Sequence, residues 1–261
     1  MLDWIKEQEI HGRVVFSIDD VRKGLHGKSE NAIRAGLRRA IGAGRIQSVR
    51  PGFYVIVPPQ YVLGGVVPPS YYIDALLEWM GKPYYICLLS AAAMYGAGHQ
   101  RPMVTQVMTV PPRAVASGKN PYISWCYRQE VPKELLVQKN AEMGVVKYSS
   151  AELTSVDLVQ FANHVGGYQR AATVLAELAP SIRPELLSAV VPYTTVAALQ
   201  RLGYLLEFVL EENRLANELY AVLDGKTFKR IVMRNDQPED TTATANRWKV
   251  NMNINIEIDE L

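Results

Sequence analysis

The sequence has only two cysteines and no long apolar run among its 261 residues. Cys87 and Cys126 lie far apart among apolar or aromatic neighbours, a pattern that fits neither a disulfide framework nor a zinc site. We expect both to be small buried side chains. No stretch reaches the roughly 18 apolar residues that cross a bilayer, and the N-terminus lacks the basic and apolar regions of a signal peptide. These absences predict a cytoplasmic protein with no membrane contact and no metal.

Catalytic motifs are missing as well. The four histidines have none of the neighbours that zinc hydrolases or deaminases place around theirs, and there is no glycine-rich phosphate loop or nucleophile elbow. Glu152 and Asp157 fall near a predicted helix start, where acidic side chains favour the helix dipole, so we interpret them as structural. The sequence predicts a protein that is not an enzyme and holds no cofactor. A hydrolase or nucleotidyltransferase site built from distant positions stays an alternative.

Acidic residues are scarce in one region of the chain. The net charge is +2, yet residues 1–60 hold ten Lys or Arg and six Asp or Glu, 10 − 6 = +4, which leaves 18 − 20 = −2 for the rest. Between Arg22 and Arg50, eight basic residues accompany one acidic residue, Glu30. A field of one sign attracts a polyanion, which makes nucleic acid the expected partner.

The basic region has a pattern of three helices followed by a hairpin. We expect helices at residues 3–10, from SIDDVRKGL onward, and after Ser29, since Ser and Asp are favoured caps. Residues 46–49 and 53–57 read as strands joined by a Pro-Gly turn. This order is typical of a winged helix-turn-helix, a DNA-binding fold whose third helix lies in the major groove.

The third helix has two distinct faces. Ile33, Leu37 and Ile41 recur at helical spacing and, supported by Ala40, predict the face that packs inward. The residues expected to contact DNA are Asn31, Arg34 and Arg38 for base edges, and Lys28, Ser29, Arg39 and Arg50 for phosphates. The alternative is an ordinary solvated helix face with a positively charged loop.

Proline and glycine pairs follow in PPQYVLGGVVPP and mark a linker at about residues 58–69. We expect a domain of residues 1–60 before it and a larger domain of residues 70–261 after it. The larger part mixes predicted helices with short strands, so the expected class is α+β: a winged helix-turn-helix followed by a mixed α/β domain. Residues 248–258 alternate between apolar and polar and predict one half-buried strand, paired with residues 228–233.

Three stretches of the larger part resemble the antitoxin domain of the AbiEi family, the antitoxin half of bacterial AbiE-type systems. They are YYICLLSAAAMYGAGHQRPMVTQVMTV, AELTSVDLVQFANHVGGYQRAATVLAEL and VAALQRLGYLLE, in the family's order and spacing. A basic winged helix is the family's usual companion. The resemblance implies that residues 70–261 are an AbiEi-like antitoxin domain.

The resemblance also implies a two-gene toxin-antitoxin module of bacteria or archaea, usually classed as type IV and linked to phage defence. There the antitoxin represses its own promoter through inverted repeats, which puts two copies on double-stranded DNA and leaves open whether they first form a dimer. It protects the cell from a neighbouring nucleotidyltransferase-like toxin, and a stable toxin complex is not required. The alternative is a stand-alone transcriptional regulator whose C-terminal domain senses a ligand or oligomerises.

A polar cluster behind an Ala-rich helix is the surface we would first associate with antitoxicity, because loops carry function more often than the elements they join. Its members are Ser90, Tyr95, His99, Gln100 and Arg101. Each also has an ordinary structural reading: Ser90 as a helix cap, Tyr95 as a core residue and His99 as a turn residue.

Overall fold

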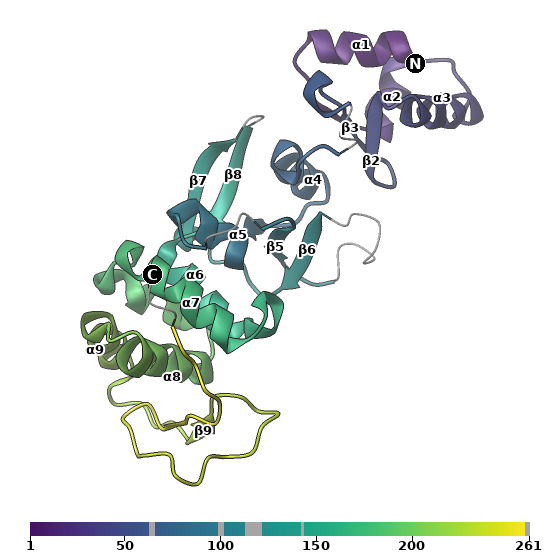
Figure 1. The fold of residues 1–261 in the computed structure, drawn as a ribbon. Coiled ribbons are helices and arrows are strands. Elements are labelled where there is room, and N and C mark those ends of the chain that lie inside the picture. The colour runs from purple at the N-terminus through teal and green to yellow at the C-terminus, as the bar shows by residue number, and fades with distance from the viewer. Residues whose placement is uncertain (63–65, 99–101, 113–121, 142–143, 259–261) are drawn as a thin grey trace. The chain divides into compact units, whose positions relative to one another are not determined.

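The computed structural model describes residues 1–62, 66–98, 102–112, 122–141 and 144–258 (Figure 1). The chain divides into two compact units. Unit 1 comprises Met1–Tyr84, Thr109–Gln129 and Gln138–Lys147, and unit 2 comprises Tyr85–Met108, Glu130–Val137 and Tyr148–Leu261. Helices occur together with mixed sheets, so the expected α+β class is confirmed. None of the described helices is long and apolar enough to cross a membrane.

Residues 1–57, here called the N-terminal module, contain the three helices and the hairpin that the sequence predicts. The elements are α1 (Leu2–Ile10), β1 (Val15–Ser17), α2 (Ile18–Gly24), α3 (Glu30–Gly42), β2 (Ile46–Arg50) and β3 (Phe53–Ile56). The strands form an antiparallel sheet in the order β1-β3-β2. Gly52 has a φ of +86° between β2 and β3, a conformation that suits glycine and explains the position of the predicted turn.

Side-chain caps determine where α2 and α3 begin. The Ser17 hydroxyl accepts a hydrogen bond from the backbone N–H of Asp20 at 3.2 Å. The Asp20 carboxylate in turn accepts one from the backbone N–H of Ser17 at 2.7 Å, which completes a capping box. Ser29 caps α3 by accepting from the backbone N–H of Ala32 at 3.3 Å. Of Ser17 and Asp19, the two residues that the sequence offered as the cap of α2, the structure has Ser17, and the cap predicted at Ser29 is confirmed.

The N-terminal module has an apolar core of its own. Its buried members are Trp4, Ile5, Phe16, Val21, Ile33, Leu37, Ala40, Ile46, Tyr54 and Ile56. Ile33 and Leu37 point inward as predicted, but Ile41 is 38% exposed and Ala40 takes the third inward position. At 100° per residue, i+7 lies closer to the direction of residue i than i+8 does, so the true stripe is Ile33, Leu37 and Ala40.

A five-stranded sheet follows along the chain in the order β6-β5-β4-β8-β7. Its strands are β4 (Tyr84–Ile86), β5 (Thr105–Thr109), β6 (Ile123–Tyr127), β7 (Leu136–Ala141) and β8 (Gly144–Ser149), and α4 (Ile73–Trp79) precedes them. Strands β4 and β8 run parallel, with Ile86 opposite Tyr148. Parallel and antiparallel neighbours in short strands are typical of a mixed α/β arrangement.

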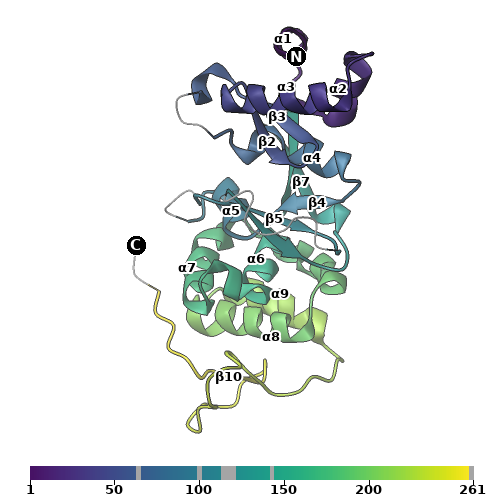
Figure 2. The same cartoon turned by 90° about the vertical axis from the view of Figure 1, so that its right-hand side faces the viewer.

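Unit 2 is mainly helical. Its α-helices are α5 (Leu88–Ala92), α6 (Ala151–Gln160), α7 (Tyr168–Leu178), α8 (Val196–Tyr204) and α9 (Asn213–Leu223). Helices α6 to α9 lie together in both views (Figures 1 and 2). After Tyr204, α8 changes to a π-helical turn at Leu205–Val209. Such turns recur at functional sites and inside packed helices, where they redirect the side chains of one turn.

The prediction of one long strand over residues 248–258 is wrong. Only β10 (Val250–Asn251) is a strand, and it pairs in parallel with β9 (Ile231–Val232). The side chain of Asn251 bonds to both the backbone N–H and the carbonyl of Asp240, at 2.9 and 2.8 Å. Asn253 donates to the carbonyls of residues 234, 237 and 238. Asparagine side chains therefore satisfy backbone groups that a neighbouring strand would otherwise pair.

Trp248 anchors this C-terminal segment within unit 2. Its side chain is fully buried, and its indole N–H donates to Glu207 Oε2 at 2.6 Å. Arg247 donates to the same carboxylate oxygen at 2.7 Å. Gly203 of α8 provides the room for the indole, because a Cβ at that position would lie 2.1 Å from Cζ3 of Trp248. Gly203 and the π-helical turn, which carries Glu207, together form the site in which the Trp248 side chain is buried.

Replacing Gly203 by alanine is expected to lower the free energy of unfolding of unit 2 by about 1–3 kcal/mol or more, because a rigid buried ring occupies the space. Urea unfolding followed by circular dichroism measures the change. Gly42→Ala is the matched control, since it is also helical and its added Cβ meets nothing within 4 Å. The control should keep or slightly raise the midpoint. Equal midpoints for the two variants would contradict the packing described for Trp248.

Candidate nucleic-acid interface

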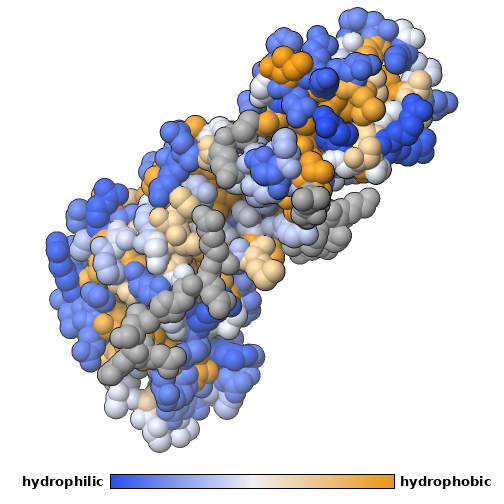
Figure 3. Space-filling view, turned by 45° about the horizontal axis from the view of Figure 1, so that its top comes forward, coloured by the Kyte–Doolittle hydropathy of each residue, from blue (hydrophilic) through white to orange (hydrophobic). Residues whose placement is uncertain are grey.

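The outward face of α3 carries the three residues predicted to contact base edges. Asn31, Arg34 and Arg38 follow one another at i, i+3 and i+7, and all three side chains are exposed. They lie on one face because Ile33, Leu37 and Ala40 commit another face to the core. On the surface drawn in Figure 3, strongly hydrophilic residues gather on the N-terminal module, at the upper right. The structure therefore brings these candidates together, as predicted.

The four residues predicted to contact phosphates differ in how exposed they are. Lys28, Ser29 and Arg39 are exposed, in or just before α3. Arg50, at the end of β2, is only half-exposed, and its Nη1 lies 3.6 Å from the sulfur of Met80, just beyond α4. Within unit 1 the structure thus ties Arg50 to the end of α4, whereas the other three face solvent.

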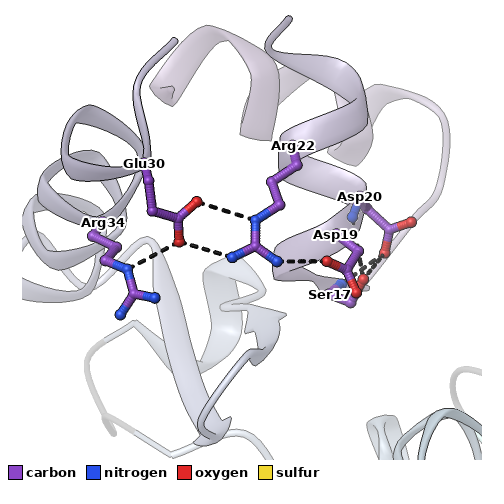
Figure 4. A network of polar contacts seen from close by, with 6 residues as sticks. All are labelled: Ser17, Asp19, Asp20, Arg22, Glu30 and Arg34. Atoms are coloured by element: carbon purple, nitrogen blue, oxygen red, sulfur yellow. Dashed lines mark hydrogen bonds and ion pairs between the residues drawn. The ribbon is translucent and has the colours of Figure 1, made fainter.

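A chain of four charged side chains joins α2 to the start of α3 (Figure 4). Arg22 donates to Asp19 through Nη1 at 2.7 Å, and to Glu30 through Nε at 3.1 Å and Nη2 at 2.8 Å. Arg34 donates to the same Glu30 through Nε at 3.0 Å. This is called the Glu30 network below. Its members are two acidic and two basic residues, so its formal charge is zero.

Hydrogen bonds keep the Glu30 network charged. The hydrogen bonds from Arg22 and then Arg34 hold the pKa of the Glu30 carboxyl below its ordinary value, although partial desolvation acts in the opposite direction. The hydrogen bonds that Arg22 donates to Glu30 and then Asp19 raise the pKa of its guanidinium. Lys23, Lys28, Arg38 and Arg39 are exposed and have no ion pair or side-chain hydrogen bond with any described residue, so their positive charge is not neutralised by a contact.

The sequence predicted Arg34 as a base contact, but the ion pairs that link Arg34 to Glu30 and Glu30 to Arg22 were not predicted. The Glu30–Arg34 pair has the i, i+4 spacing of helix ion pairs, so the sequence did hold a signal for it. The contact from Arg22 comes from another helix and has no such signal, because it depends on how α2 and α3 pack. Arg22 was counted as part of an attracting basic region, but its donors are occupied by Glu30 and Asp19.

Of the residues first associated with antitoxicity, the structure describes two. Ser90 is half-buried inside α5, two residues after the helix begins, so its reading as a helix cap is wrong. Its hydroxyl accepts from the backbone N–H of Gln106 at 3.0 Å. Tyr95 donates to the carbonyl of Ser149 at 2.8 Å, and burial raises its pKa to about 12. His99, Gln100 and Arg101 lie outside the described residues. The hydroxyls of Ser90 and Tyr95 are therefore used within unit 2.

Buried acidic groups of unit 2 have structural partners. Glu152 is 1% exposed and accepts from the backbone N–H of Arg183 at 3.0 Å. Asp157 is fully buried and accepts from the Tyr85 hydroxyl at 2.7 Å. Over the described ranges, no three His, Cys, Asp or Glu side chains are grouped in a way that could hold a metal ion. Cys87 and Cys126 are both buried, as expected.

The fold resembles a solved structure. The crystal structure of the RV2827C protein from Mycobacterium tuberculosis superposes with a TM-score of 0.70, and the match covers 94% of this chain and 88% of that chain. Sequence identity is 17%, so the similarity concerns the fold alone. No curated protein matches the sequence.

The family of the C-terminal part follows from the sequence match. Residues 84–208 match the AbiEi antitoxin C-terminal domain, a segment that begins in β4 and ends in the π-helical turn. All three stretches that carried the resemblance fall within it. The AbiEi antitoxin family is not an enzyme family. Residues 84–208 are therefore identified as an AbiEi antitoxin C-terminal domain.

Proposed function

We propose that the protein is the antitoxin of a two-gene toxin-antitoxin module. It neutralises a nucleotidyltransferase-like toxin in the cytoplasm and represses its own operon by binding inverted repeats in the promoter. The observation that carries the proposal is the AbiEi antitoxin C-terminal domain at residues 84–208. A type IV mode of action, in which no stable toxin complex is needed, and a role in phage defence belong to the same proposal.

The N-terminal module supports the DNA-binding part of the proposal. Its order α1-β1-α2-α3-β2-β3, with a three-stranded antiparallel sheet, supports a winged helix-turn-helix assignment, in which α3 would enter the major groove. The outward face of α3 then offers Asn31 to adenine and Arg34 and Arg38 to guanine, the pairings that their donor geometry favours. Lys28, Ser29 and Arg39 flank this face and suit phosphates.

The proposal also assigns DNA binding and antitoxicity to different parts of the chain. All buried members of the module's core come from residues 4–56, so the module has the core of an independent domain. Residues 1–60 would then bind DNA, a linker would lie at about residues 58–69, and residues 70–261 would confer antitoxicity. Two copies would occupy the two halves of an inverted repeat.

Removal of single arginines should separate base contacts from phosphate contacts. Arg34→Ala or Arg38→Ala should weaken binding to a promoter fragment by about 1–3 kcal/mol and relax base preference at one position. Arg39→Ala and Arg50→Ala should weaken binding to the promoter fragment and to a scrambled duplex alike, and should reduce the salt slope by about one. Fluorescence anisotropy with both duplexes at several salt concentrations measures these effects.

Lys6→Ala is the control, because Lys6 is an exposed basic residue of α1, outside the proposed interface. It removes the same charge and should change both affinities by less than about twofold. Equal losses on promoter and scrambled duplexes for every arginine variant would remove α3 from its proposed role as the helix that reads bases.

Antitoxicity should survive the loss of DNA binding. The adjacent gene's product is expressed in a bacterial host from an unrelated promoter, together with the full-length protein or its Arg38→Glu/Arg39→Glu variant. Wild type and variant should both restore growth, whereas only the wild type should repress a reporter driven by the module's own promoter. Charge reversal at two solvent-facing positions should leave the fold intact, which circular dichroism checks.

Two results would overturn parts of this proposal. A harmless neighbour, or a toxic one against which the wild type gives no protection, would leave a transcriptional regulator and remove the antitoxin assignment. A folded variant that fails to protect would show that DNA binding and antitoxicity are not separate functions.

A further inference from the structure

Arg34 is held from one side only. Its Nε donates to Glu30 at 3.0 Å, and in Figure 4 its two terminal nitrogens lie on the side away from that carboxylate. Neither terminal nitrogen makes a hydrogen bond or ion pair with another described residue. The end of the guanidinium that bears two parallel N–H donors is therefore left for a ligand.

Arg22 holds Glu30 in a different manner. It donates to the carboxylate through two nitrogens and to Asp19 through the third, so every guanidinium nitrogen of Arg22 has an acceptor. Because Arg22 belongs to α2 and Glu30 to α3, the carboxylate is oriented from outside its own helix. Glu30 is thus a fixed acceptor for Arg34, and Arg22 is not available to a phosphate while the network is intact.

We propose that Glu30 is a positioning residue that determines base specificity by holding Arg34 for a guanine. This inference rests on the proposed DNA-binding function. An arginine held through Nε can present its two terminal nitrogens to O6 and N7 of guanine, the bidentate pairing that most often reads this base. Since the side chain is restrained before DNA binds, less rotamer freedom is lost at the specific site.

The negative charge of Glu30 also contributes to specificity by weakening non-specific binding. The carboxylate neutralises Arg22 and Arg34, and it competes with any phosphate oxygen that approaches either guanidinium. Without it, both arginines could bind the DNA backbone at any sequence, which strengthens non-specific binding. Glu30 therefore favours the specific complex and disfavours the others, and specificity is the ratio of those two affinities.

A purely structural role of Glu30 makes a different prediction. The side chains of Glu30 and Arg34 are 43% and 61% exposed, and exposed ion pairs contribute little to stability. If the Glu30 network only linked α2 to α3, its loss would slightly lower the melting temperature and leave base preference unchanged. Base preference at one position is thus the property that separates the two roles.

The test is binding-site selection from a randomised duplex pool with full-length wild type, Glu30→Gln, Arg34→Ala and Asp19→Asn. Wild type should select a guanine that Arg34→Ala no longer selects, and Glu30→Gln should lose the same guanine. By anisotropy, Glu30→Gln should reduce the affinity ratio of selected to scrambled duplex at least about fivefold, with a steeper salt dependence on the scrambled duplex. Asp19→Asn removes an acidic residue from the same network without touching Arg34, and should keep the guanine.

The outcomes are distinguishable. Retention of that guanine and of the affinity ratio by Glu30→Gln would overturn the inference and leave the proposed function intact. A wild type that selects no sequence would overturn both. If Glu30→Gln does not fold, Arg34→Lys serves instead, because lysine keeps the charge but lacks the two-nitrogen fork. Unchanged guanine selection by Arg34→Lys would also overturn the inference.

Discussion

The packing of one apolar stripe of α3 decides what the N-terminal module shows to solvent. Ile33, Leu37 and Ala40 are 3%, 2% and 0% exposed, in contact with the core formed by the other helices and the sheet. A helix is rigid, so fixing this stripe fixes the direction of every other side chain on α3. Rotating α3 to bring its basic face inward would bury unpaired charges at high cost, so the core enforces a single orientation.

The basic residues on the exposed side are not equivalent once the contacts are known. Lys28, Arg38 and Arg39 carry charge without a described ion-pair partner, so each adds to the local positive field. Arg22 and Arg34 are neutralised by Asp19 and Glu30, so they add little to that field. The net charge of residues 1–60 already subtracts Asp19 and Glu30, but it does not reveal that they pair with Arg22 and Arg34 or that Arg34 is restrained.

Local signals made much of the fold predictable. Serine caps, a Pro-Gly turn and helical apolar spacing correctly indicated the elements of the N-terminal module, because each depends on residues within a few positions. Contacts between distant residues were not predictable, and the indole of Trp248 against Gly203 is the clearest example. The alternation in residues 248–258 was misleading because the side chains of Asn251 and Asn253 bond to backbone groups.

In the candidate site, too, the local pattern was predictable and the contacts between distant residues were not. Spacing alone placed Asn31, Arg34 and Arg38 on one face, and the structure agrees. The link from Arg22 to Glu30 crosses the turn between two helices, so no spacing rule reveals it. Arg50 was expected to contact a phosphate, and it lies beside Met80 through a tertiary contact that the sequence does not indicate. An antitoxin role has no local signature of this kind and is supported only by the match of residues 84–208 to the AbiEi antitoxin C-terminal domain.

The measurement that tests the central claim most directly is methylation interference on the module's own promoter. Methylating guanine N7 removes the major-groove acceptor that an arginine of α3 would use. The account predicts that methylation of guanines in two half-sites, about one helical turn or a multiple of it apart, prevents binding by the wild-type protein. Binding that is unaffected by methylation of any guanine, and is blocked only by ethylation of phosphates, would contradict it.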